Sequence, residues 1–145
     1  MTAPLYTTEI LRLAASIPHL GRLAAPMATV ARRAVPCGSA IALDLDLDAD
    51  GRVAALGIDL SACALGQASA CLMARAAIGR TPGELAAARD ALAAWLAGTA
   101  DEPGDWPDLM LLARARPHAG RHGAIRLPFE AAAAAADAAL TERQR

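Results

Sequence analysis

An alternation of large aliphatic residues with alanine or aspartate over residues 40–48 constrains the fold more than any other stretch of this chain. The aliphatic set is Ile41, Leu43, Leu45 and Leu47, and the acidic set is Asp44, Asp46 and Asp48. A period of two predicts a half-buried β-strand with a solvated acidic face. The segment DADG then predicts a turn, and RVAALGIDL (residues 52–60) predicts a second, antiparallel strand. The aspartates lie on a strand pattern, so we do not expect the helix-flanked loop of a calcium site.

Helical patterns surround this hairpin, so the sequence predicts an α+β fold in which a small antiparallel sheet packs against several α-helices. We expect helices over residues 8–17 (capped by Thr7 or Thr8), 65–78, 82–95 (capped by Thr81), 108–116 and 127–140. Aromatic residues make up only 3% of the chain, so the core must consist mainly of alanine and aliphatic side chains. No shift in composition divides the chain, and we expect residues 1–145 to form one domain.

Charge and hydropathy exclude two classes of partner. The formal net charge is −1 and no basic block stands out, so we expect no nucleic-acid partner. No run of apolar residues is long enough for a membrane span, and Glu9 and Arg12 interrupt the region where a signal peptide would be apolar. We therefore expect a cytoplasmic protein without a membrane partner. Cysteines in that compartment serve metal or redox chemistry more often than structural disulfides.

The three cysteines occupy different kinds of position. Cys37 lies in a bend before the first strand, and Cys63 lies between the second strand and the next helix. Because the two strands form a hairpin, Cys37 and Cys63 are predicted to be neighbours. The partial positive charge of a helix N-terminus would favour the thiolate that binds metal, although both residues could instead be small buried apolar side chains. Cys71 falls within an apolar helix and is predicted to lie in the core.

Several motifs, in their order along the chain, resemble the IscU/NifU-type, SufU-related iron–sulfur cluster assembly scaffolds. These motifs are LYTTEILRLAA, the CGS bend, the two strands with their acidic turn, ACALGQASACLMARAAIGRT and RHGAIRLPFEA. The resemblance implies an IscU-like fold. It also implies a scaffold that holds a transient [2Fe–2S] cluster, or a zinc or iron ion, with sulfur supplied by a cysteine desulfurase and with other assembly proteins as partners.

The resemblance further implies that Cys37, Cys63 and His122 are the ligands of the metal or cluster. Ser39 stands where the family has an aspartate, and Gly123 stands where it has a third cysteine. Since a [2Fe–2S] unit needs four ligands, this set is incomplete, whereas two cysteines, one histidine and a water would suit zinc. His118 is an alternative ligand.

Three functions compete on this basis. The first is a cluster assembly scaffold or carrier whose site is completed by a partner, a small thiol or a second subunit. The second is an adaptor or regulator of the assembly machinery that has lost cluster binding. The third is a thiol enzyme with Cys63 as nucleophile and His122 as base, for which the sequence supplies no evident orienting acid. We therefore expect a binding protein and not an enzyme, and its oligomeric state stays open.

Overall fold

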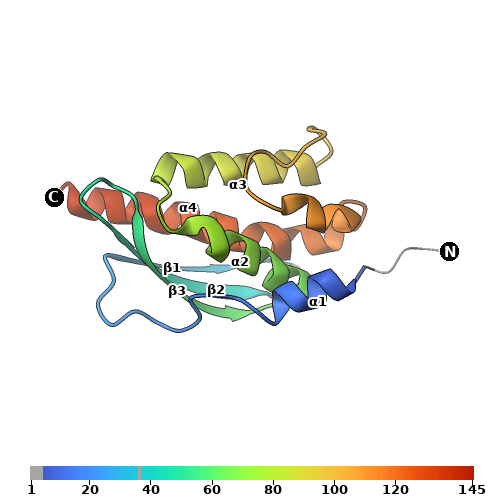
Figure 1. Cartoon of the computed structure of the whole chain (residues 1–145), viewed down its shortest axis with the longest axis horizontal. Coiled ribbons are helices and arrows are strands. Elements are labelled where there is room, and N and C mark those ends of the chain that lie inside the picture. The colour runs from blue at the N-terminus through green and yellow to red at the C-terminus, as the bar shows by residue number, and fades with distance from the viewer. Residues whose placement is uncertain (1–4, 36) are drawn as a thin grey trace.

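The computed structural model describes residues 5–35 and 37–145, and it confirms the predicted α+β class (Figure 1). Residues 1–4 and Pro36, the proline that precedes the CGS bend, lie outside the described residues. The strands are β1 (Ala28–Arg33), β2 (Ala40–Leu47) and β3 (Val53–Ser61). The helices are α1 (Thr8–Ala14), α2 (Ala64–Ala77), α3 (Pro82–Leu96), α4 (His122–Arg143) and the short 3₁₀ helices η1 (Leu109–Ala115) and η2 (Ala119–Arg121).

The predicted hairpin is confirmed, and a strand that was not predicted extends it. In the β2–β3 pair, Ala40 lies opposite Ser61 and Leu47 lies opposite Val53. Strand β1 pairs antiparallel with the other edge of β2, which gives the sheet order β1-β2-β3. Only Ala28 and Val30 of β1 are buried, so its alternation is too short to distinguish a strand from a loop in the sequence.

Helix α4 lies across β1 and β2 and packs against α2 and α3, while α3 lies on the side of α4 away from the sheet (Figure 1). The alanine run of α4 explains this central position, because small side chains let neighbouring backbones approach closely. Its fully buried members are Ala131, Ala132, Ala135, Ala136 and Ala139. Larger side chains, such as Leu43, Ile58 and Phe129, fill the remaining core.

The prediction of a solvated acidic face on β2 is wrong for Asp44. Residues 18–27 cross this face, and Asp44 is fully buried beneath them. Its carboxylate accepts hydrogen bonds from Arg22 at 2.8 Å, from the Leu23 amide at 2.9 Å and from Thr29 at 2.6 Å. Gly57 permits the crossing, since a Cβ there would lie 2.7 Å from the Gly21 carbonyl oxygen. The alternation predicted the strand correctly, but it carries no information about which segment covers the polar face of the strand.

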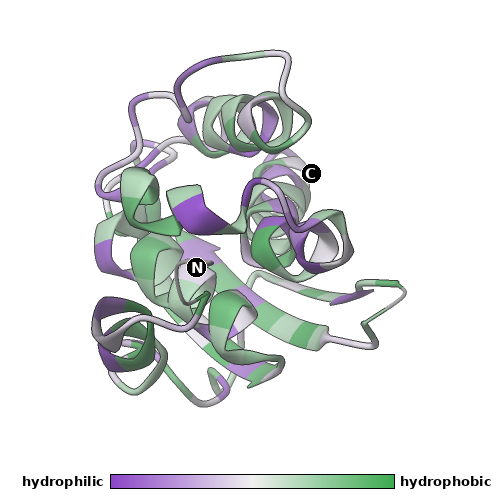
Figure 2. Cartoon of the chain, turned by 90° about the vertical axis from the view of Figure 1, so that its right-hand side faces the viewer, coloured by the Kyte–Doolittle hydropathy of each residue, from purple (hydrophilic) through white to green (hydrophobic). Residues whose placement is uncertain are grey.

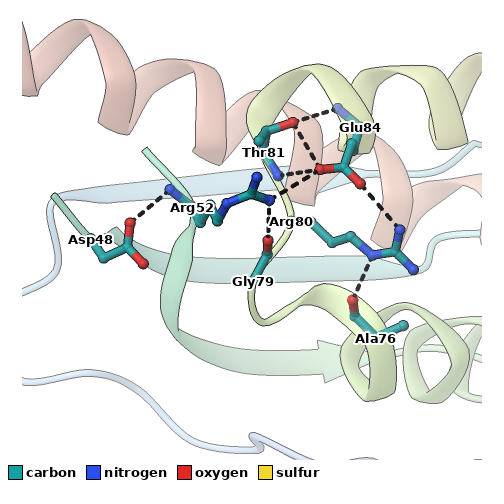
Figure 3. Close-up of polar contacts among 7 residues, drawn as sticks. All are labelled: Asp48, Arg52, Ala76, Gly79, Arg80, Thr81 and Glu84. Carbon is teal, nitrogen blue, oxygen red and sulfur yellow. Dashed lines mark hydrogen bonds and ion pairs between the residues drawn. The ribbon is translucent and has the colours of Figure 1, made fainter. Parts of the chain in front are cut away.

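Helix α3 begins at the predicted cap, where side chains also join it to the β2–β3 turn (Figure 3). The Thr81 hydroxyl accepts from the Glu84 amide at 3.1 Å, and the Glu84 carboxylate accepts from the Thr81 amide at 3.2 Å. This reciprocal pair is a capping box. Glu84 also lies 3.3 Å from Arg80 and 3.6 Å from Arg52, whose amide donates to Asp48.

Helix α4 begins at His122, five residues earlier than predicted, so His122 and Gly123 lie in its first turn instead of a loop. Pro128 therefore falls inside the helix, where it removes one backbone donor. The buried Ser69 hydroxyl donates to the Ile125 carbonyl oxygen at 2.5 Å and satisfies an acceptor close to that interruption. Although α4 has 22 residues, neither it nor any other described helix is both long and apolar enough to traverse a bilayer.

Helix α1 begins as predicted after Thr7, whose hydroxyl accepts from the Ile10 amide at 3.2 Å. It ends at Ala14, three residues before the predicted end. Ile10 and Leu13 are buried, whereas the neighbouring Leu11 is 52% exposed. The buried face of α1 is therefore narrow.

Candidate functional site

The predicted site residues come from three elements that begin or end at the same end of the molecule, which faces the viewer in Figure 2. Cys37 lies in the loop that joins β1 to β2, and Cys63 is the N-cap of α2. His122 is the first residue of α4. The pairing of Ala40 with Ser61 brings the β1–β2 loop and the end of β3 together.

The first turn of α4 lies against the two cysteine-bearing segments. A Cβ at Gly123 would lie 3.4 Å from the Cβ of Ala34 and 3.4 Å from the carbonyl oxygen of Val35. On the other side, a Cβ at Gly66 would lie 3.3 Å from the Cβ of Ala124. The start of α4 is therefore flanked by the β1–β2 loop and by the start of α2.

Cys37 is exposed, and its sulfur lies 3.3 Å from the Ser39 hydroxyl oxygen and 3.8 Å from the Ala34 carbonyl oxygen. The hydrogen bond with Ser39 holds the pKa of the Cys37 thiol below its ordinary value, and the positive charge of Arg121 acts in the same direction. Because the thiolate is the form that binds metal, a lowered pKa on an exposed cysteine favours metal binding. The role of Arg121 was not predicted; its proximity depends on the packing of α4 against the loop.

Cys63 is half-buried and lies where we predicted it, directly before the first residue of α2. Its backbone is extended (φ −67°, ψ 170°), and its side chain makes no capping hydrogen bond to the helix. The first amides of α2, which have no hydrogen-bond partner within the helix, therefore lie next to Cys63. A serine or threonine at an N-cap usually accepts a hydrogen bond from one of these amides, and the Cys63 sulfur does not.

Cys71 is fully buried in the core, as predicted. Its sulfur lies 3.5 Å from the Ser16 carbonyl oxygen, a contact that joins α2 to the end of α1. This cysteine has a structural environment that differs from those of Cys37 and Cys63.

His122 is half-buried, and its Nε2 lies 2.8 Å from the carbonyl oxygen of Arg116 and 3.2 Å from that of Ala115. Because both partners accept, Nε2 carries the proton and Nδ1 of a neutral ring keeps its lone pair. Metal-binding histidines usually donate their second ring N–H to a carboxylate or backbone carbonyl in this way. His118, the alternative ligand, is exposed at the start of η2.

Among residues 5–35 and 37–145, no group of three or more histidine, cysteine or acidic side chains is arranged to hold a metal ion. The joint ligation of a metal by Cys37, Cys63 and His122 therefore stays a prediction. The donor types suit zinc or an iron–sulfur cargo, since both accept thiolate and imidazole ligands. For joint ligation, the side chains of Cys37, Cys63 and His122 would have to rearrange and come together around the metal.

Comparison with solved structures shows close similarity over nearly the whole chain. A nitrogen-fixing NifU-like protein (N-terminal) from Brucella abortus matches with 34% sequence identity and a TM-score of 0.88, covering 94% of this chain and 95% of that one. A candidate iron–sulfur cluster assembly scaffold protein for the SUF system from Fervidobacterium islandicum matches at a TM-score of 0.83 and 17% identity, covering 91% and 96%. The second match shows the fold alone. No protein-family model matches the chain, and no curated protein sequence does.

Proposed function

Because the chain belongs to the IscU/NifU-like family, we propose that it is an iron–sulfur cluster assembly scaffold or carrier. The observation that carries the proposal is the meeting of three elements at one end of the molecule, each with a potential ligand. The cargo is a nascent [2Fe–2S] cluster or a single zinc or iron ion. It is held transiently, which agrees with a ligand set that lacks a fourth strong donor.

We assign the ligand role to the sulfurs of Cys37 and Cys63 and to Nδ1 of His122. The free lone pair on Nδ1, with Nε2 bonded to the Arg116 carbonyl, supports the assignment of His122. Gly123 leaves one position open next to the β1–β2 loop. A small thiol, a partner's side chain or a second subunit would complete the coordination and could also help to remove the cargo.

A scaffold of this kind receives sulfur from a cysteine desulfurase, and the exposure of Cys37 makes its sulfur accessible to such a donor. Other iron–sulfur assembly proteins would receive the cargo. We place the protein in the cytoplasm as one domain without enzymatic activity and without nucleic-acid or membrane partners. Its cysteines are all free, as suits a reducing compartment.

The second candidate function is an adaptor or regulator of the assembly machinery. The observation that favours it is that the described side chains form no group of three ligands. A thiol enzyme with Cys63 and His122 is less well supported, because the hydrogen bonds that orient the His122 ring come from backbone carbonyls and not from an acidic side chain. These alternatives differ in metal retention, which makes metal binding the decisive measurement.

The test is a zinc titration in competition with a chromophoric chelator, followed by anaerobic reconstitution with iron and sulfide. Wild-type protein should bind about one zinc ion and develop the visible absorption of a [2Fe–2S] cluster with matching iron and sulfide counts. Cys37→Ala, Cys63→Ala and His122→Ala should each weaken zinc binding by about tenfold or more. His118→Ala is the matched control and should bind as the wild type does. Folded wild-type protein that retains no metal would favour the adaptor.

A further inference from the structure

Ser39 is a nearly buried polar residue, with 4% of its surface exposed, directly behind the exposed Cys37. Its hydroxyl oxygen lies 3.3 Å from the Cys37 sulfur. Within the described part of the chain, that sulfur is the one hydrogen-bond partner shown for the hydroxyl. A buried hydroxyl rarely lacks a partner, so the contact with Cys37 satisfies both groups.

The β1–β2 loop holds the two side chains in this relationship. The Ala34 amide donates to the Ser39 carbonyl oxygen at 2.8 Å, and the Gly38 amide donates to the Ala34 carbonyl oxygen at 2.9 Å. Gly38 has a φ of 77°, a backbone conformation that glycine adopts without steric cost. The hydrogen-bonded loop therefore sets where the Cys37 sulfur stands relative to the Ser39 hydroxyl.

The direction of the hydrogen bond depends on whether the sulfur carries a proton. In the free protein the thiol can donate to the Ser39 oxygen. A sulfur bonded to a metal has lost its proton, so the hydroxyl must then be the donor. The same pair of atoms thus remains hydrogen-bonded in both states.

From this geometry we infer that Ser39 is a positioning residue for Cys37: its hydroxyl orients the sulfur and donates a hydrogen bond to it when a metal or cluster is bound. The inference rests on the proposed function, and it makes Ser39 a partner of the ligand and not a ligand itself. A hydroxyl that faces the sulfur adds no negative charge to the site, unlike the aspartate that the family resemblance implies at this position. Hydrogen bonds to ligating sulfurs are one of the means by which proteins tune such sites.

The first test needs no metal. The S–H stretching band of Cys37, assigned by its loss in Cys37→Ala, should lie below that of a free thiol in wild-type protein, because hydrogen bonding weakens the S–H bond. In Ser39→Ala it should move to higher wavenumber, and in Ser39→Thr it should stay near the wild-type position. Ser61→Ala is the matched control, since Ser61 is an exposed serine at the same end of the sheet. A wild-type band at the free-thiol position would overturn the inference, and this outcome needs no variant at all. A band that Ser39→Ala leaves unmoved would also overturn it.

The second test uses zinc and cobalt(II) as probes. Ser39→Ala should weaken zinc binding about 10- to 100-fold, the usual effect of losing a group that orients a ligand. It should also shift the sulfur-to-cobalt charge-transfer band to lower energy, which a purely structural serine would not do. Unchanged affinity and an unchanged band would overturn the positioning role even if the S–H band moves. If wild-type protein binds neither ion, the proposed function fails, and the S–H band still decides whether Ser39 holds Cys37.

Discussion

Gly123 lies directly against Val35: a Cβ added to the glycine would stand 3.4 Å from the carbonyl oxygen of Val35, at ordinary van der Waals distance. The glycine belongs to the first turn of α4 and does not have a positive φ. Its backbone can therefore accept a side chain without strain. The family resemblance assigns a third cysteine to this position. Gly123 lacks the side chain, but the backbone conformation here is one that a cysteine could adopt.

We predict that Gly123→Cys binds zinc at least about tenfold more tightly than the wild type, because a third thiolate would join Cys37 and Cys63. Stability should be unchanged or rise by a few tenths of a kcal/mol, since glycine is a poor helix former. Chelator competition and thermal unfolding would measure the two effects. Gly120→Cys is the control, because that glycine lies nearby with open space around it. An equal gain in Gly120→Cys would show that an added thiol acts without the predicted geometry.

Cys71 and Cys63 should respond in opposite ways to alanine substitution. Cys71→Ala should lower the free energy of unfolding by about 1 kcal/mol or more, since its fully buried sulfur contacts the end of α1, and should leave zinc content unchanged. Cys63→Ala should lose zinc at little cost in stability, because Cys63 makes no capping hydrogen bond. Denaturant unfolding combined with metal analysis separates the two roles. Equal metal loss in both variants would contradict this assignment of Cys71.

The buried carboxylate of Asp44 should make stability depend on pH below about pH 4. Its hydrogen bond to Arg22 is the main reason that its pKa falls from 3.8 to about 2 in the folded protein. A lowered folded-state pKa stabilises the protein above the unfolded-state value, and this contribution disappears as the pH falls towards 2. Asp44→Asn should therefore lower the unfolding free energy by about 2 kcal/mol at neutral pH, and the difference from wild type should shrink in acid.

Denaturant unfolding of wild type and Asp44→Asn over this pH range measures that difference. Asp50→Asn serves as the control, since Asp50 is exposed on the β2–β3 turn and its loss should change stability little. A gap between wild type and Asp44→Asn that stays constant from neutral pH to pH 2 would argue against a charge effect.

Thr81→Ala should remove one half of the capping box at the start of α3 and lower the unfolding free energy by about 1 kcal/mol. The Glu84 amide would lose its acceptor, and the Arg52–Glu84 contact near the β2–β3 turn would be less well held. Thr141→Ala, at an exposed position late in α4, is the control with little expected effect. Equal unfolding midpoints for the two variants would count against the capping role.

The features that the sequence by itself determined depend on residues close together along the chain. The β2–β3 hairpin followed from the alternation and the DADG turn, and the start of α3 followed from the Thr81 and Pro82 pair. The positions of Cys63 before a helix and of Cys71 in the core followed from the same local patterns. Each depends on spacings of two to four residues, which a sequence displays directly.

Tertiary structure alone decided the features that join distant segments. Asp44 is buried because residues 18–27 cross the sheet, and α4 extends back to His122 because it packs between the β1–β2 loop and α2. That packing also turns the His122 ring towards the Arg116 carbonyl and places Gly123 beside Val35. A polar face or a glycine has the same local pattern whether it meets water or another segment. The environment of such a residue is therefore decided only when segments far apart in sequence come into contact and remove water from it.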